Sequence, residues 1–147
     1  MKLSHVAADG SVAMVDVSAK RITSRFASAE AIVRMNAAAH AAIREATLAK
    51  GDALAVAQIA GILAAKRTAT LIPLAHQLPL TSVAVSFSWR PDGALAIEAE
   101  ARTSAQTGVE MEAMTAAAVA ALTIYDMAKA LDRRITIESV RLLKKTK

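Results

Sequence analysis

Apolar and polar residues alternate through two neighbouring stretches in the middle of the chain. Within residues 81–89, large apolar side chains occupy every second position from Val83 to Trp89, and serine or alanine lies between them. The alternation returns over residues 94–102, after the segment Pro-Asp-Gly at 91–93. A period of two is typical of a half-buried strand, and Pro-Asp-Gly favours a turn. The pattern therefore predicts a β-hairpin.

Three other stretches predict helices, over residues 37–49, 53–71 and 109–131. Asn36 and Asp52 precede the first two and are suited to accept hydrogen bonds as N-caps. Pro73 ends the second, because the residue before a proline disfavours helical backbone. The bulky residues of the second stretch lie broadly on one helix face: Leu54, Ile59, Ile62 and Leu63.

The remaining segments are less regular. Residues 1–20 are small and polar with a turn signal at Asp9-Gly10, so we expect a loop-rich N-terminal arm. Short strand pieces are expected around Ile22 and over 31–34, and residues 135–143 alternate as a last strand. The resulting order of elements is β, α, α, β, β, α, β. It predicts an α+β fold with a ferredoxin-like antiparallel sheet and helices packed on one face.

Composition changes this picture in three ways. With 147 residues and no linker or repeat, the chain is expected to form a single domain over 1–147. Alanine accounts for 36 residues, so closely approaching helices are expected. Cysteine is absent, which excludes thiolate chemistry and favours a reduced, cytoplasmic compartment. We expect no membrane segment, because the apolar runs are too short to cross a bilayer.

The net charge and the aromatic content indicate which class of ligand the chain is suited to bind. The net charge is +5, and three of the positive charges lie at 144–147, where we expect a short, solvated basic tail. The body of the chain is therefore only mildly basic, and aromatic residues make up 3% of the sequence. These features favour a small anionic ligand over a nucleic acid, for which stacking residues and a larger positive charge are usual.

Common nucleotide and metal motifs are missing. Neither a glycine-rich dinucleotide motif nor a P-loop occurs. His5, His40 and His76 are far apart in sequence, so no protein-built metal site is expected.

Two local features could bind or react with an anionic ligand. Lys50-Gly51-Asp52 places a lysine at a helix start, where backbone N–H groups favour an anion. An ordinary C-cap glycine followed by an N-cap aspartate explains the same residues. His76 lies between two prolines that stiffen its loop, and its imidazole could act as an acid or base. The alternative is a histidine that only donates a hydrogen bond to a loop carbonyl.

Asp126 and Lys129 lie three positions apart and share a helix face. A surface ion pair explains this spacing, but Asp126 is flanked by apolar residues, where Lys129 could lose its proton and act as a base. Glu112 precedes Asp126 by fourteen positions, which is about 21 Å along a helix axis. The two carboxylates therefore serve different tasks, or a second subunit completes the site.

Six runs of sequence, in order along the chain, resemble the MoaC family. They are MVDVSAK (14–20), KGD (50–52), IAGILAAKRT (59–68), LIPLAHQLPL (71–80), TGVEMEAMTA (107–116) and ALTIYDMAKA (121–130). The resemblance implies a lyase of molybdenum cofactor biosynthesis. Such an enzyme converts 3′,8-cyclo-7,8-dihydro-GTP, supplied by an upstream radical GTP cyclase, into cyclic pyranopterin monophosphate and pyrophosphate. It also implies a homohexamer, a trimer of dimers, with the site at the dimer interface.

The resemblance assigns roles to individual positions. Asp126, Lys129 and Lys50 match the family's catalytic residues. The substrate-binding positions it implies are Leu74, Ala75, His76, Glu110, Met111, Glu112, Lys66 and Arg25. The lysines and Arg25 are expected to hold phosphates, and Asp126 with Lys129 to transfer protons. No cofactor is required by these residues, although Mg²⁺ could accompany the triphosphate.

The chain departs from the family pattern at a few positions. Ala75 and Ala128 stand where many members have cysteine, and Gln106 stands where a lysine is common. Loss of that lysine leaves open a degenerate relative that binds the nucleotide without turning it over. A non-catalytic, basic ferredoxin-like module that binds nucleotides or RNA is a further alternative, because this fold supports many functions.

Overall fold

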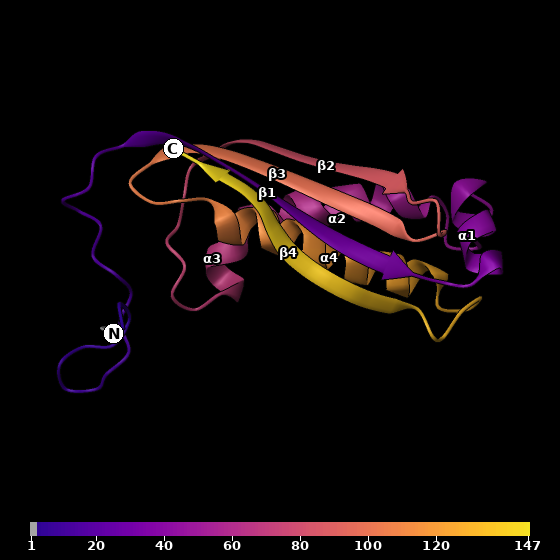
Figure 1. The fold of residues 1–147 in the computed structure, drawn as a ribbon, viewed down its shortest axis with the longest axis horizontal. Coiled ribbons are helices and arrows are strands. Elements are labelled where there is room, and N and C mark those ends of the chain that lie inside the picture. The colour runs from indigo at the N-terminus through magenta and orange to yellow at the C-terminus, as the bar shows by residue number, and fades with distance from the viewer. Residues whose placement is uncertain (1–2) are drawn as a thin grey trace.

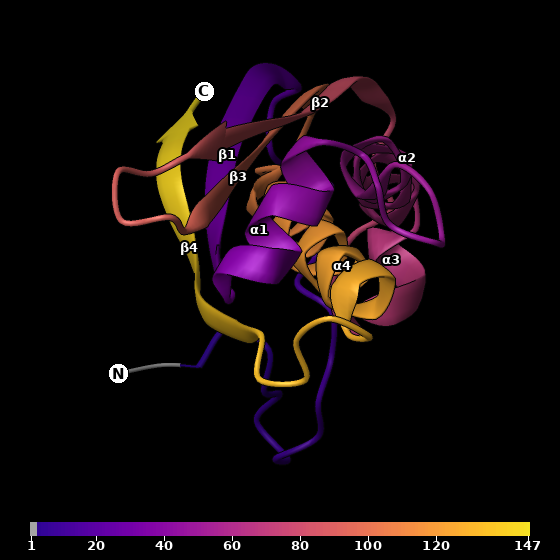
Figure 2. The same ribbon diagram turned by 90° about the vertical axis from the view of Figure 1, so that its right-hand side faces the viewer.

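The computed structural model describes residues 3–147 and shows a four-stranded antiparallel sheet with helices on one face (Figures 1 and 2). The elements in chain order are β1 (Thr23–Arg34), α1 (Ala37–Arg44), α2 (Ala53–Lys66), α3 (Thr68–Leu71), β2 (Leu80–Trp89), β3 (Leu95–Ala105), α4 (Glu110–Ala128) and β4 (Thr136–Thr146). The strands lie in the order β2-β3-β1-β4. This confirms the predicted α+β fold and its ferredoxin-like arrangement.

The central hairpin follows the alternating pattern closely. β2 pairs with β3 from Leu80 opposite Thr103 to Trp89 opposite Leu95. Leu95, Ile97 and Ala99 of β3 are fully buried. Alternation of apolar residues places these side chains against the helices, so the predicted hairpin is confirmed. β1 is one continuous strand instead of two short pieces, and it pairs with both β3 and β4.

Small residues form the contact between α2 and α4. α2 buries Ala53, Ala57, Gly61, Ala64 and Ala65. A Cβ atom at Gly61 would lie 3.0 Å from the carbonyl oxygen of Ala116 and 3.4 Å from the Cβ of Ala120. The two helix backbones therefore approach closely, as the alanine content predicts. In consequence, Ile59 and Leu63, two members of the bulky face predicted for this helix, remain exposed at the surface.

All three predicted helices end earlier than predicted, and α4, expected over 109–131, ends at Ala128. α1 has the predicted N-cap, because the Asn36 side chain accepts from the Ala39 N–H, but it ends at Arg44 and not at residue 49. Ala46 adopts φ +54°, and Thr47 N–H donates to the Ala42 carbonyl. This is a Schellman C-cap with alanine in the position that usually holds glycine, which the sequence does not signal.

The stretch predicted as one helix over 53–71 is divided at Arg67. The Asp52 side chain caps α2 as predicted, but the backbone leaves the helical region at Arg67, with φ −111° and ψ 11°. The short helix α3 then leads towards the loop that carries His76.

Most of the C-terminal segment belongs to a strand and is not a free tail, although its residues are solvent-exposed as its charge predicts. β4 continues to Thr146, so that Lys144 and Lys145 pair with Ser28 and Ala27 of β1. The pairing brings both lysines to the end of the sheet where α4 begins. A sequence rule based on charge alone misses this, because alternate residues of an edge strand face solvent and can be charged.

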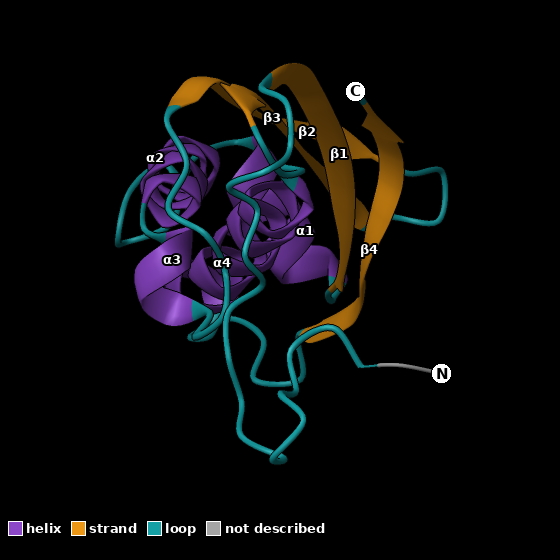
Figure 3. Ribbon diagram, turned by 90° about the vertical axis from the view of Figure 1, so that its left-hand side faces the viewer, coloured by secondary structure: helices purple, strands orange, loops and turns teal. Residues whose placement is uncertain are grey.

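The sequence predicts a loop-rich arm over residues 1–20. Residues 3–22 form such an arm, and residues 1 and 2 lie outside the described residues. Val6 and Val12 form an isolated bridge, and the segment contains no longer strand. The arm lies at one end of the molecule beside the loop between α3 and β2 (Figures 1 and 3). In the part of the chain that the structure describes, no helix is both long and apolar enough to span a membrane.

Candidate functional site

A cavity of about 430 Å³ lies at the end of the molecule where α4 begins. Three segments form its walls: the N-terminal arm, the loop before β2, and the entry into α4. The lining residues are Ser4, His5, Val15, Val17, Lys20, Leu74, Ala75, His76, Leu78, Thr107, Gly108, Glu110, Met111 and Glu112. Six of the eight predicted substrate-binding residues therefore line one cavity, and the two not among its lining residues are Lys66 and Arg25.

Two carboxylates of the α4 entry differ in environment. Glu112 is buried, with 4% of its surface exposed, and desolvation raises its pKa to about 7. Burial also opposes ionisation of Glu110, but a hydrogen bond and ion pair from Lys145 outweigh it and lower the pKa of Glu110. At neutral pH, Glu110 is a hydrogen-bond acceptor, whereas Glu112 exchanges a proton readily. Two neighbouring carboxyl groups thus have different chemical capacities.

His76 is fixed by the arm. Its Nε2 lies 2.6 Å from the carbonyl oxygen of Val15. A carbonyl only accepts hydrogen bonds, so Nε2 carries a proton, and in the neutral tautomer that makes this contact Nδ1 is the acceptor. The alternative for His76, a hydrogen bond to a loop carbonyl, is therefore present, and the same ring also lines the cavity. Its action as an acid or base stays a prediction.

Arg25 lies close to the cavity without lining it. Its Nη2 donates to the Gln106 carbonyl at 3.4 Å, and its charge contributes to lowering the pKa of Glu110. The Nε atom of Arg25 is buried and has no hydrogen-bond partner. A buried donor without a partner is costly. Lys66, by contrast, is exposed at the end of α2 and lines neither this cavity nor a smaller neighbouring one.

The three predicted catalytic residues meet at the opposite end of α4. Lys129 Nζ lies 3.0 Å from Asp126 Oδ1, and Lys50 Nζ lies 3.4 Å from Oδ2. Lys50 also donates to the Asp126 carbonyl at 2.8 Å, close to the C-terminal end of the helix dipole. Hydrogen bonds from Lys129 and Lys50 lower the pKa of Asp126. The three-residue spacing along α4 places Lys129 beside Asp126, whereas Lys50 belongs to the loop before α2.

The surroundings of Asp126 differ from the expectation in one respect. Its side chain is 59% exposed, although its neighbours in sequence are apolar. The buried face of α4 carries Ile124 and Met127 instead. In this chain alone, Asp126 and Lys129, which is 51% exposed, are therefore both open to solvent.

The two groups of site residues are separated along α4. Glu112 and Asp126 both lie in the helix, and their fourteen-residue separation corresponds to about 21 Å. The cavity residues lie in and around the first turn, whereas Lys50, Asp126 and Lys129 lie around the last. We refer to these groups as the cavity end and the lysine end of α4.

Sequence reasoning missed three charged or titratable side chains at the cavity end. His5 and Lys20 of the arm line the cavity, and Lys145 of β4 pairs with Glu110. Lys20 closes the run MVDVSAK, which carried part of the family resemblance and was the available signal. Lys145 was assigned to a solvated tail, and only strand pairing with β1 brings it to the site.

The chain is similar to known proteins over almost its full length. The model of the MoaC family matches residues 14–147. A protein of Corynebacterium efficiens named cyclic pyranopterin monophosphate synthase is 54% identical over 145 residues, covering 99% of this chain and 93% of the relative. Proteins with the same name from Desulfitobacterium hafniense and Syntrophomonas wolfei are 49% and 50% identical, and the alignments cover 99% of this chain and 90% and 94% of the relatives.

Proposed function

Because this chain belongs to the MoaC family, we propose that the two ends of α4 act together in the reaction of that family. The chain is a lyase of molybdenum cofactor biosynthesis, and its product is cyclic pyranopterin monophosphate. The substrate is 3′,8-cyclo-7,8-dihydro-GTP, and pyrophosphate is released. The observation that carries the proposal is the grouping of six family-matched residues around one cavity of about 430 Å³. That volume suits a single small-molecule ligand.

The cavity end binds the ring system. Glu110, ionised beside Lys145, accepts hydrogen bonds from N–H groups of the guanine-derived ring. Glu112 has a pKa of about 7 and so gives or takes a proton as the ring rearranges. His76 presents Nδ1 as an acceptor, because Val15 holds the proton on Nε2.

The lysine end supplies proton transfer and positive charge. Cyclic phosphate formation requires a substrate hydroxyl oxygen to attack the α-phosphorus, while the bond to the bridging oxygen of pyrophosphate breaks and the electron pair leaves with that oxygen. Asp126 is held ionised by two lysines and accepts the hydroxyl proton. Lys50 and Lys129 stabilise the charge that develops on phosphate oxygens. Each of the two lysines lies within 3.4 Å of the Asp126 carboxylate, so the positive charges of both favour its ionised form.

In a dimer, the cavity end of α4 from one copy of the chain and the lysine end of α4 from the other copy form one site. About 21 Å along α4 separates Glu112 from Asp126, which is too far for one chain to apply both to the same bond. Val56, Ile59 and Leu63 are exposed at helical spacing on α2, and Leu122 of α4 is 58% exposed. Apolar surface of this kind is buried in symmetric oligomers. A homohexamer built as a trimer of dimers, with each site at a dimer interface, satisfies both observations.

Other expectations follow from the substrate. A radical GTP cyclase supplies it, in the cytoplasm where GTP-derived nucleotides are made. Within residues 3–147 no group of three or more histidine and carboxylate side chains could hold a metal ion. Magnesium, where it takes part, would therefore enter with the triphosphate and be bound largely by phosphate oxygens.

Turnover tests the proposal directly. The purified chain is incubated with 3′,8-cyclo-7,8-dihydro-GTP, and pyrophosphate and the oxidised, fluorescent pterin are measured. We expect both products from the wild type and neither from Asp126→Ala. Tight binding of the substrate without product would instead identify a degenerate relative, with Gln106 as the first position to change. Absence of binding would contradict the proposal.

A further inference from the structure

Few polar contacts join the N-terminal arm, residues 3–22, to the body of the chain. The Val15 carbonyl accepts a hydrogen bond from His76 Nε2 at 2.6 Å, and the Ser18 carbonyl accepts one from Gln106 Nε2 at 3.4 Å. Among the residues that the structure describes, no other hydrogen bond links the arm to the body. The position of the arm therefore depends on two side chains of the body.

Apolar packing under the arm is incomplete. A cavity of about 210 Å³ has Val17 and Ile22 of the arm on one side and Leu78, Pro79 and Ala105 of the body among its other lining residues. Ile22 is 68% exposed. Atoms that face an unfilled space lose the dispersion contacts that close packing would give them. The two hydrogen bonds therefore carry a large share of the free energy that docks the arm.

Strand register places Gln106 against the arm. Ala105, the last residue of β3, pairs with Thr23, the first residue of β1. Gln106 therefore lies beside the point where the arm enters the sheet. Its carbonyl accepts from Arg25 Nη2 at 3.4 Å, so β1 holds its backbone while its side chain donates to the arm. Residues 107 and 108, which follow it directly, line the larger cavity.

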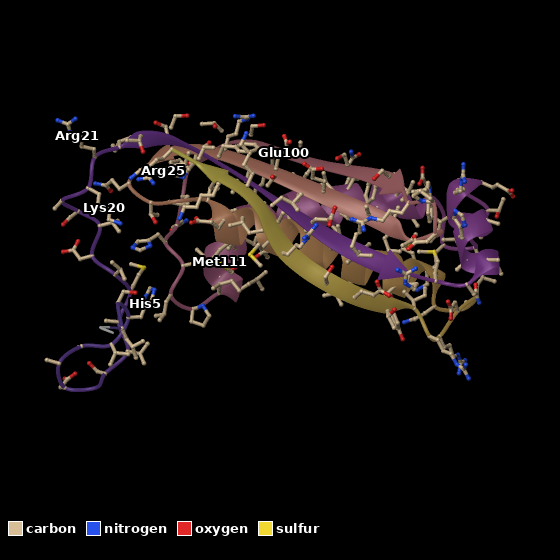
Figure 4. The ribbon with its side chains drawn as sticks, in the orientation of Figure 1. His5, Lys20, Arg21, Arg25, Glu100 and Met111 are labelled. Carbon is tan, nitrogen blue, oxygen red and sulfur yellow. The ribbon has the colours of Figure 1, made fainter. Side chains whose placement is uncertain are left out.

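The docked part of the arm has turns of its own. Asp16 Oδ1 accepts a hydrogen bond from the Ser18 N–H at 2.9 Å, and the Val17 carbonyl accepts from the Lys20 N–H at 2.9 Å. Figure 4 shows Lys20 of the arm at the same end of the molecule as Met111 of α4, and both line the larger cavity. The turns keep this wall of the cavity in shape, so its distance from α4 is set by the contacts with the body.

We propose that Gln106 is a positioning residue, which holds the arm against the body and so closes one wall of the larger cavity. The identity of the ligand comes from the proposed function, on which this inference rests. Gln106 acts through the arm and does not touch the reacting atoms. The docked arm is the binding-competent state. A weaker contact at Ser18 therefore lowers the apparent affinity for the nucleotide through the fraction of docked molecules and leaves the chemical step unchanged.

Trypsin cleavage of the ligand-free chain tests the contact directly. Trypsin cuts after Lys20 and Arg21 when this segment leaves the body, because a protease needs a flexible stretch of chain. The cleavage rate follows the undocked population where docking is fast. Loss of one hydrogen bond in Gln106→Ala should accelerate cleavage about twofold to tenfold. Gln106→Glu keeps the size of the side chain but cannot donate when ionised, and it should also be cut faster.

Gln58→Ala is the matched control. Gln58 Nε2 also donates to a backbone carbonyl, that of Val85 at 2.9 Å, but it lies in α2 and does not contact the arm. The cleavage rate of this variant should equal that of the wild type. A body fragment from residue 21 or 22 to 147 that stays uncut shows that each variant is folded. Equal cleavage of the wild type and both Gln106 variants would overturn the proposal.

Kinetics with 3′,8-cyclo-7,8-dihydro-GTP separate positioning from chemistry. Gln106→Ala should raise KM, by no more than the factor measured for cleavage, and leave kcat within about twofold. A lower kcat with an unchanged KM would overturn the positioning role. Faster cleavage of Gln106→Ala supports the contact even where the chain shows no turnover, which would contradict the proposed function alone. Unchanged cleavage in an active synthase would contradict the role of Gln106 alone.

Discussion

The two ends of α4 both carry a carboxyl group, but the environments of the two groups shift their pKa values in opposite directions. At the cavity end, Glu112 is buried and its pKa is raised to about 7. At the lysine end, Asp126 is 59% exposed, and hydrogen bonds from Lys129 and Lys50 lower its pKa. The first carboxyl group exchanges protons near neutrality, whereas the second stays ionised.

The contrast arises from neighbours more than from the helix itself. The arm, the loop before β2 and the end of β4 surround the first turn of α4 and exclude water from Glu112. At the last turn, Lys50 from the loop before α2 contacts Asp126, and the side chain of Asp126 remains open to solvent or to a partner. A rigid helix between them keeps the ends apart, which explains why one chain presents half of each proposed site.

Removing the carboxylate at the lysine end should have the largest effect. Asp126→Asn is expected to lower kcat about a hundredfold or more, because a proton acceptor is lost. The melting temperature should stay close to that of the wild type, since the side chain is exposed. Kinetics and thermal unfolding of the same preparation check both statements. A variant that keeps most of its turnover would remove Asp126 from the mechanism.

Neutralising the buried carboxyl group should change stability as well as activity. The pKa of Glu112 rises from 4.5 to about 7 on folding. Its protonated form is therefore favoured in the folded state, and the wild type loses stability as pH rises from about 4.5 to 7. Glu112→Gln should become the more stable protein over that window, by up to about 3 kcal/mol. Urea unfolding at a series of pH values measures the difference, and a pH-independent difference would contradict the raised pKa.

The close packing of α2 against α4, the helix that holds the two ends apart, can be tested at Gly61. An added Cβ would lie 3.0 Å from both the Ala116 carbonyl oxygen and Val85 Cγ2. Overpacking should outweigh the higher helix propensity of alanine, so that Gly61→Ala lowers the free energy of unfolding by about 1 kcal/mol. Chemical denaturation provides the value. An increase in stability would show that α2 and α4 separate without cost.

The smallest expected effect concerns the ion pair at the cavity end. Lys145→Ala removes the partner of Glu110, so the pKa of Glu110 should rise, as carbon-detected titration of its carboxyl group can show. The lowered pKa contributes stability above the usual value of 4.5 that is lost as pH falls. The variant should therefore be less stable at neutral pH, by less than about 1 kcal/mol, and equal to the wild type in acid. Lys147→Ala, at the end of the same chain, is the control.

The fold was largely predictable because local pattern and tertiary packing agree. Alternation over 81–89 and 94–102 identified the hairpin, and Asn36 and Asp52 identified two helix starts. Helix ends were less predictable. An alanine in left-handed conformation ends α1, although glycine usually occupies that position.

Spacing in the sequence predicts contacts between site residues only where the residues lie close together on one helix. Asp126 and Lys129 meet because they are three positions apart on one helix. Lys20 and Lys145 reach the cavity through docking of the arm and pairing of β4. The run MVDVSAK was a signal for Lys20, whereas no local pattern signals Lys145. Lys66 matched a family position but lies outside the cavity, so similarity alone did not place it.

Mixing two inactive variants tests most directly whether the ends of α4 from two copies form one site. Glu112→Gln and Asp126→Asn are unfolded together in equal amounts, refolded, and assayed with the nucleotide substrate. A mixed dimer has one site with both lesions and one intact site, so about a quarter of wild-type activity should return. Mixing Lys50→Ala with Asp126→Asn, which damage the same end, should restore none. Activity no greater than the sum of the separate variants in the first mixture would contradict the account.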